Sequence, residues 1–190
     1  LEDYGLLYRL TESGTIPKIS VRTESKELGM VPTYNTVAEL KGAEKASEYV
    51  MMSAHFDSWD GGAGATDNGT GTLTMMEAMR ILKKVYPNPK RTILVGHWGS
   101  EEQGLNGSRA FVEDHQDIIE NLQALFNQDN GAGRIVNISG QGFLNSYEYL
   151  SRWLTKVPEA MRTPIETRFP GTPGGGGSDF ASFVAVGAPA

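Results

Sequence analysis

Two apolar stretches with little polar alternation constrain the fold of this chain most. They are YVMMSA at residues 49–54 and RTILVGHW at residues 91–98. Strands that are covered on both faces have this pattern, because neither face meets water. Parallel strands also need long crossover connections, and a helical pattern follows each stretch. The two stretches therefore predict an α/β fold around a buried sheet.

The rest of the chain alternates strand and helix patterns. We expect residues 34–40 and 49–54 to form a hairpin, because only a charged, turn-like stretch separates them. Apolar residues at helical spacing predict a long helix over residues 67–85, ended by Pro87. Further strands are expected at 122–127 and 134–139, and further helices near 110–112, at 147–157 and at 179–186. This alternation predicts a three-layer α/β/α sandwich with a mixed, mostly parallel central sheet.

Length and composition limit the number of domains and the kinds of partner. The chain has 190 residues, which suits one principal domain, expected at 34–190 after a glycine- and proline-broken connecting segment at 1–33. A net charge of -6 argues against nucleic acid or an anionic membrane as partner. No apolar run approaches the roughly 18 residues of a membrane span. Peptides or other small molecules are the favoured partners, and the oligomeric state is open.

One imidazole and one carboxylate lie at the end of the first buried stretch. His55 and Asp57 have the i, i+2 spacing that puts both side chains on the same face of a strand. A carboxylate in this position can support a metal-ligating imidazole. The alternative is a hydrogen-bonded structural histidine and a turn-forming aspartate, and the spacing taken alone favours that alternative.

Carboxylates follow three other predicted elements. Asp67 opens the helix after a glycine-rich loop, where helix capping is the ordinary role. Glu101 and Glu102 follow the second buried stretch, and Asp129 lies in a turn sequence after the strand at 122–127. Open α/β sheets bind ligands at the carboxyl ends of their strands, so these groups could share one site. Zinc accepts both imidazole and carboxylate, and a two-metal centre uses a bridging carboxylate and a free one as base.

Two other chemistries are poorly supported. The loop at 61–64 lacks the third glycine of a dinucleotide fingerprint, and Asp67 would repel a pyrophosphate at that helix start. The segment at 176–180 lacks the second glycine of a nucleophile elbow, so a serine triad is not indicated. His97 and His115 lie within predicted elements and are expected to be structural.

The order of the motifs resembles one family. The motifs are HFDS at 55–58, GATDNG at 64–69, SEEQG at 100–104 and NQD at 127–129. Together they resemble the M28 family of zinc peptidases, in particular its aminopeptidase and plasma glutamate carboxypeptidase-like branch. The resemblance implies a zinc exopeptidase-like domain at 34–190, preceded by the exit of a protease-associated domain. It also implies a secreted or periplasmic protein.

The resemblance further implies a role for each candidate residue. Asp67 would bridge two zinc ions, His55 and Asp129 would complete one zinc site, and Glu102 would bind the other zinc. Glu101 would be the general base and Asp57 would orient His55. Ser178 and Asp179 would line the substrate pocket.

The same resemblance implies a final zinc-ligand histidine beyond the segment that matches 187–190. We therefore expect a C-terminally truncated domain that holds one zinc ion or none and is impaired as an enzyme. The activity implied for the intact protein is dizinc exopeptidase action on the N-terminal residues of peptides or on dipeptides. The alternatives are a non-catalytic peptidase-like binding domain and a zinc enzyme of related fold that cyclises aminoacyl groups.

Overall fold

The computed structural model describes residues 2–174 and 176–190, which divide into two compact units, Leu1–Pro32 and Thr33–Ala190. The first unit contains one helix, α1 (Glu2–Glu12), among its described residues. This helix differs from the expectation of a connecting segment without helices at residues 1–33. The second unit carries both hydrophobic core clusters and every candidate site residue.

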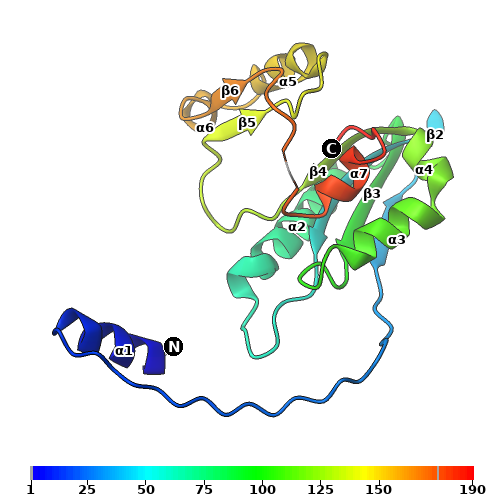
Figure 1. Ribbon diagram of the computed structural model, residues 1–190. Coiled ribbons are helices and arrows are strands. Elements are labelled where there is room, and N and C mark those ends of the chain that lie inside the picture. The colour runs from blue at the N-terminus through cyan, green and yellow to red at the C-terminus, as the bar shows by residue number, and fades with distance from the viewer. Residues whose placement is uncertain (1, 175) are drawn as a thin grey trace. The chain divides into compact units, whose positions relative to one another are not determined.

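A four-stranded mixed sheet forms the centre of the second unit (Figure 1). Its strands are β1 (Thr36–Leu40), β2 (Lys45–His55), β3 (Arg91–Trp98) and β4 (Leu122–Asn127), in the spatial order β1-β3-β2-β4. Strand β2 runs parallel to β3 and to β4, and β1 runs antiparallel to β3. The predicted mixed, mostly parallel sheet is confirmed.

The predicted hairpin of residues 34–40 and 49–54 is wrong. Strand β1 pairs with β3 instead, so that Thr36 lies opposite His97 and β3 separates β1 from β2. The residues of β3 are buried almost throughout, whereas those of β1 are exposed except for Leu40. A strand that is apolar on both faces takes an interior position, where its backbone groups find partners on both edges. The exposed strand is therefore left at the edge, whatever the length of the turn that follows it.

Helices cover both faces of the sheet, as the predicted α/β/α sandwich requires (Figure 1). On one face, α2 (Thr70–Val85) packs over a cluster that includes Met52 and Val95. On the other face, α3 (Asn106–Asp114), α4 (Gln116–Glu120) and α7 (Phe180–Val184) belong to a larger cluster that includes Met51 and Trp98. Neighbouring residues Met51 and Met52 thus enter different layers, because successive side chains alternate across a strand. This explains the lack of polar alternation in the sequence.

The helix predicted from residue 67 begins later. A short π-type segment, η1 (Ala65–Gly69), precedes α2, and Asp67 has non-helical angles of φ -115° and ψ 98°. The amide oxygen of Asn68 accepts the backbone N–H of Gly71 at 3.0 Å, while its amide nitrogen donates to the backbone oxygen of Gln128 at 2.8 Å. Asn68 therefore accepts one of the unpaired N–H groups of the first helical turn, and the carboxylate of Asp67 is not needed for this bond.

The chain between β4 and α7 forms a small second sheet. Strands β5 (Asn137–Ser139) and β6 (Glu166–Arg168) are parallel, and α5 (Ser146–Leu154) and α6 (Glu159–Arg162) lie between them in the chain. The strand predicted at 134–139 and the helices predicted at 147–157 and 179–186 are present in shorter form. The elements α4, α6 and β6 were not predicted, because three to five residues are too few to show a period.

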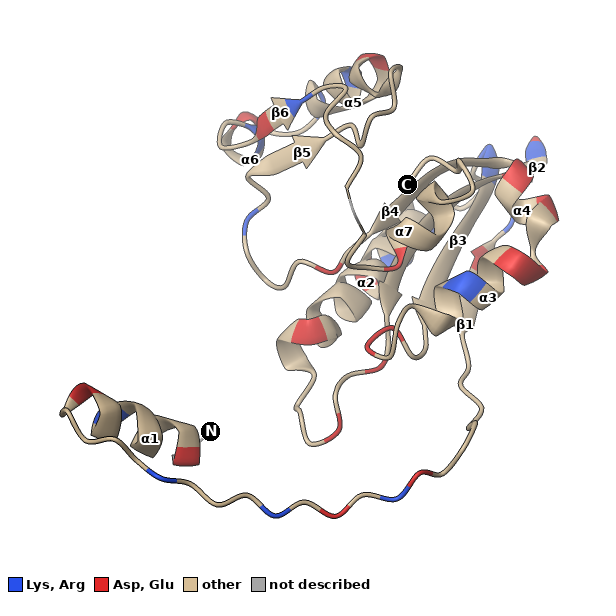
Figure 2. Cartoon of the chain, in the orientation of Figure 1, with Lys and Arg blue, Asp and Glu red and all other residues tan. Residues whose placement is uncertain are grey.

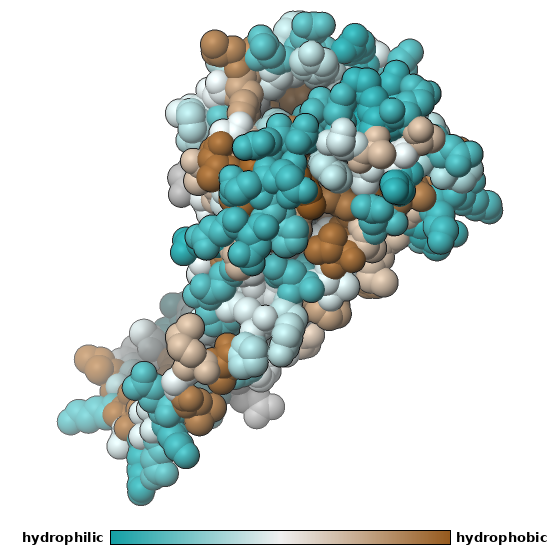
Figure 3. Space-filling view, turned by 90° about the vertical axis from the view of Figure 1, so that its right-hand side faces the viewer, coloured by the Kyte–Doolittle hydropathy of each residue, from teal (hydrophilic) through white to brown (hydrophobic). Residues whose placement is uncertain are grey.

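Among the described residues, no helix has both the length and the apolar character that crossing a membrane requires. The face drawn in Figure 3 is mostly hydrophilic, with separate brown patches among teal and white side chains. Scattered apolar side chains of this kind are ordinary on protein surfaces.

Candidate metal centre

Three candidate ligands from different elements converge at the carboxyl edge of the sheet. His55 is the last residue of β2, Asp67 lies in η1, and Asp129 follows β4. One donor atom from each lies within 4.8 Å of the other two. The Nε2 atom of His55 is 3.0 Å from Asp67 Oδ1 and 3.2 Å from Asp129 Oδ1. One imidazole nitrogen and two carboxylate oxygens form a donor set that fits zinc.

A hydrogen bond at the Nδ1 atom of His55 fixes the orientation of its imidazole ring. Its side chain is 1% exposed, and Nδ1 lies 3.0 Å from the backbone oxygen of Asp57. Donation of the Nδ1 proton to that oxygen leaves Nε2 as the atom that faces Asp67 and Asp129. This is the tautomer and orientation that a metal-ligating histidine needs.

The charges in the cluster show what a cation would neutralise. Burial lowers the pKa of His55, but the hydrogen bond and charge of Asp129, with the charge of Glu101, outweigh burial and raise that pKa to about 9. Burial raises the pKa of Asp129, but hydrogen bonds from His55 and Ser178 outweigh it and bring that pKa below its usual range. With a pKa of about 9, His55 is expected to be an imidazolium ion at neutral pH, which balances the carboxylates. A divalent cation would supply the same balance and would replace the proton on Nε2.

Asp57 connects the cluster to the loop after β3. Its carboxylate accepts the backbone N–H of Glu101 at 3.0 Å and that of Glu102 at 3.2 Å. The same carboxylate is 3.6 Å from His55 Nδ1, which is farther than the backbone oxygen of Asp57. The predicted orienting contact to His55 therefore comes from the backbone of Asp57, and its side chain holds the glutamate loop.

Glu101 and Glu102 lie on the loop between β3 and α3, and the charges of His55 and Asp129 act on the pKa of both residues. Figure 2, which colours aspartate and glutamate red, shows red segments in this loop. Burial raises the pKa of Glu101 to about 7, with the charges of Asp179 and Asp129 acting in the same direction and His55 opposing them. Burial and the charge of Asp67 also raise the pKa of Glu102. The structure does not bring the Glu102 carboxylate into the three-residue donor group.

Ser178 and Asp179 occupy different positions relative to the cluster. The Ser178 hydroxyl accepts the side-chain N–H of Asn127 at 2.8 Å, and Asn127 in turn accepts the Ser53 hydroxyl at 2.6 Å. Asp179 is fully buried, and neither carboxylate oxygen has a hydrogen-bond partner among the described residues. Burial raises the pKa of Asp179 to about 6.

Three residues that contact the site are not among the candidates predicted from the sequence: Ser53, Asn68 and Asn127. Ser53 lies directly opposite Asn127 in the register of β2 and β4, and Asn68 contacts the backbone of Gln128. These contacts depend on strand order, which the sequence analysis did not predict in full. The available signal was the polar character of Ser53 and Asn127 within strands that are otherwise apolar.

This three-layer domain, with a histidine and carboxylates at the carboxyl edge of its sheet, has the fold of zinc exopeptidases, as the comparisons with solved structures show. Residues 35–190 match the family model of Peptidase family M28, and the chain belongs to this family. Carboxypeptidase Q of Xenopus laevis is 34% identical over 131 residues, which are 69% of this chain and 28% of that protein. Carboxypeptidase Q of Homo sapiens is 33% identical over 131 residues, with the same 69% and 28% coverage. The chain thus spans little more than a quarter of these curated relatives.

Solved structures agree with this assignment. A peptidase M28 precursor from Shewanella amazonensis superposes with a TM-score of 0.79 at 28% identity, covering 98% of this chain and 41% of that one. The zinc aminopeptidase of Bacillus subtilis gives 0.63 at 27% identity, with 82% and 38% covered. A glutaminyl cyclase from an Acidobacteriales bacterium gives 0.60 at 14% identity, with 82% and 56% covered, a likeness of fold alone.

Proposed function

We propose that this chain is the core of a dizinc exopeptidase that removes N-terminal residues from peptides or splits dipeptides. The observation that carries the proposal is the convergence of His55, Asp67 and Asp129 within 4.8 Å, beside Glu101. The similarity to carboxypeptidase Q and to a zinc aminopeptidase supports peptide bonds as the substrate. The proposed peptidase domain is 34–190, with 1–33 as a connecting segment.

In this proposal, one zinc ion has more protein ligands than the other. His55, Asp67 and Asp129 would hold one ion, and Asp67 would share its carboxylate with a second ion bound by Glu102. The Asp67 side chain is 65% exposed, so its second oxygen is accessible from solvent. Because the described residues offer fewer donors to the second ion, we infer that this chain binds it more weakly and that its activity is correspondingly low.

Each residue near the metal site has its own role in the proposed reaction. Bound zinc supplies an acidified water and polarises the scissile carbonyl. Glu101 takes the proton from water and delivers it to the leaving amine, and a carboxylate with a pKa of about 7 suits both directions. Asp57 positions Glu101 and Glu102 through their backbone N–H groups. Ser178 and Asp179 would line the substrate side of the site.

A zinc titration of the 190-residue chain, with calorimetry as the readout, tests the proposed zinc binding. We expect one tight site and one weaker site, and His55→Ala should remove the tight one. His115→Ala is a matched control, because the His115 Nδ1 atom bonds the backbone of Phe111 away from the cluster. Zinc bound equally by all three proteins would exclude the proposed ligands.

Mass spectrometry of a dipeptide and of a longer peptide, each incubated with the zinc-loaded chain, tests the activity. Loss of single N-terminal residues or cleavage of the dipeptide is the expected result. Peptide binding without cleavage would favour a peptidase-like binding domain, and a cyclised product would favour aminoacyl cyclisation. Secretion or a periplasmic location is also proposed from the resemblance, and cell fractionation tests it.

A further inference from the structure

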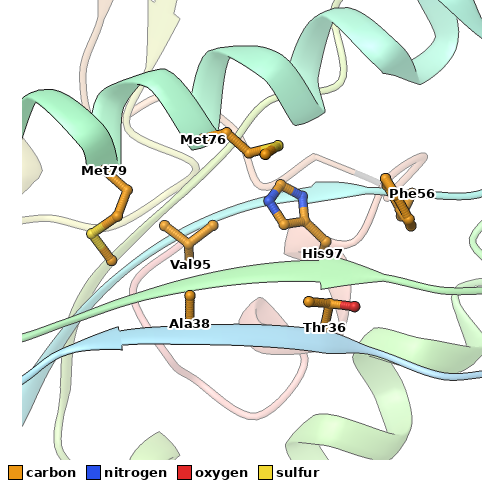
Figure 4. A pocket seen from close by; sticks show the side chains of 7 residues that line it. All are labelled: Thr36, Ala38, Phe56, Met76, Met79, Val95 and His97. Atoms are coloured by element: carbon orange, nitrogen blue, oxygen red, sulfur yellow. The ribbon is translucent and has the colours of Figure 1, made fainter.

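A hollow of about 320 Å³ lies between helix α2 and the edge of the sheet formed by β1 and β3. Figure 4 shows side chains from the helix and from both strands facing one space. Among the residues that the structure describes, no aspartate, glutamate, lysine or arginine contributes to the walls. The residues that line the hollow are Thr36, Ala38, Phe56, Met76, Met79, Val95 and His97.

Among the described residues that line the hollow, His97 alone has a nitrogen-containing ring. The residue is 8% exposed, and neither ring nitrogen has a hydrogen-bond partner among the described residues. Burial lowers the pKa of His97, so at neutral pH the ring is uncharged and offers one N–H donor and one acceptor. Buried polar atoms are normally paired, and Figure 4 shows this ring directed into the hollow.

The hollow has a closed floor and an accessible rim. Val95 and His97 are almost fully buried, whereas Phe56 is 67% exposed and Met76 is 55% exposed. The Phe56 and His97 rings have centroids 6.0 Å apart. Methionine side chains adapt to irregular shapes and make favourable contacts with aromatic rings. Apolar walls with few polar groups are typical of small-molecule sites.

We propose that this hollow binds a small, neutral aromatic molecule that carries one hydroxyl or N–H group and exchanges a hydrogen bond with His97. An anion is disfavoured, because none of the described residues in the walls is cationic and the chain has a net charge of -6. An organic cation would find no carboxylate among these described wall residues. The site is separate from the metal cluster, since Phe56 lines the hollow while its neighbour His55 enters the cluster.

A titration of the 15N-labelled chain with indole, monitored by NMR of the His97 ring nitrogens, tests this proposal. We expect a saturable shift of these nitrogens and of the Met76 methyl group. The probe 1-methylindole keeps the ring but lacks the N–H donor. It should bind roughly 2- to 10-fold more weakly, which is the size of one net hydrogen bond.

Three variants locate the binding. Ala38→Phe fills the hollow and should weaken indole binding by about 10-fold or more. His97→Phe keeps a ring but removes both nitrogens, and it should abolish the preference for indole over 1-methylindole. Val37→Phe is the matched control, because Val37 is on the same strand but does not line the hollow. Circular dichroism checks that each variant folds.

Two results would overturn the proposal. One is indole binding that leaves the His97 nitrogens unmoved or that survives Ala38→Phe unchanged. The other is a shift of the His97 signals with protein concentration alone, accompanied by dimers in sedimentation, because a second copy of the chain would then occupy the hollow.

Discussion

At the scale of single residues, the two adjacent glutamates of the β3 loop have different surroundings. Glu101 is the more buried and has a pKa of about 7, whereas Glu102 lies nearer the charge of Asp67. Their backbone N–H groups both bond Asp57. One loop therefore presents a carboxylate suited to proton transfer beside one suited to a cation.

Replacing Glu101 by glutamine tests the proton-transfer role. The change removes the carboxylate but leaves the backbone N–H that bonds Asp57. We expect peptide hydrolysis to fall by about 10²- to 10⁴-fold while zinc affinity is kept, because general-base catalysis contributes on that order. Rates from liquid chromatography and zinc binding from calorimetry measure the two effects. Glu113→Gln, on the exposed face of α3, is the control, and a Glu101→Gln rate near that of the control would contradict the role.

The raised pKa of Asp179 predicts that the stability of the chain depends on pH. Its folded-state pKa of about 6 exceeds the usual 3.8, so the folded chain binds more protons than the unfolded chain between these values. Its contribution to the free energy of unfolding therefore decreases as pH rises from 3.8 to 6. Asp179→Asn should remove this loss and make the metal-free chain more stable at pH 7, by an amount on the order of 2–3 kcal/mol.

Urea unfolding of the metal-free wild type and of Asp179→Asn at several pH values between 4 and 7.5 measures this effect. The gap between the two stability curves should widen as pH rises. Curves that stay parallel would mean that the pKa of Asp179 is the same in the folded and the unfolded chain, which would contradict the raised pKa.

At the scale of elements, the turn from β2 to α2 depends on a close approach. A Cβ atom added at Gly71 would collide with the side-chain oxygen of Asn68 and the backbone oxygen of Gln128. The amide nitrogen of Asn68 also donates a hydrogen bond to this backbone oxygen of Gln128, which ties η1 to the chain after β4. The position of Asp67 therefore depends on a helix residue that has no side chain.

Gly71→Ala should destabilise the chain by about 1–3 kcal/mol, although alanine is the better helix former by about 1 kcal/mol. We expect the steric clash to outweigh the gain in helix propensity, because both atoms that the added Cβ atom would meet are fixed by hydrogen bonds. Zinc affinity should fall as η1 moves Asp67. Gly133→Ala is the control, since a Cβ atom there meets nothing within 4 Å. Equal melting temperatures for the two variants would rule out the tight approach.

The elements also show what the sequence could predict. The buried strands β2 and β3 follow from uninterrupted apolar runs, and the motif order led to the three donors that the structure brings together. Strand pairing was predicted less well. The pairing of β1 with β3 depends on which strands are buried in the sheet, and not on the local turn after β1. The hydrogen-bonded pair of Ser53 and Asn127 depends on the register between β2 and β4, which no local pattern specifies.

At the scale of the whole molecule, metal binding and folding should be coupled. The three donors come from β2, η1 and the chain just after β4, and Asp129 is far from the other two in the sequence, so that the three meet only in the folded chain. An ion that binds the folded state alone stabilises it according to its concentration and dissociation constant. Zinc at 100 times the dissociation constant should therefore add about 2.7 kcal/mol to the free energy of unfolding.

Thermal unfolding with increasing zinc measures this coupling, and a chelator should reverse it. The increase should be absent in His55→Ala, which lacks the imidazole donor, and kept in His115→Ala. It should also weaken as pH falls, because the proton on His55 Nε2 then competes with the metal. If zinc stabilised both variants alike, the ion would bind elsewhere in the chain, and the cluster at the sheet edge would be held together by its own imidazolium and carboxylates.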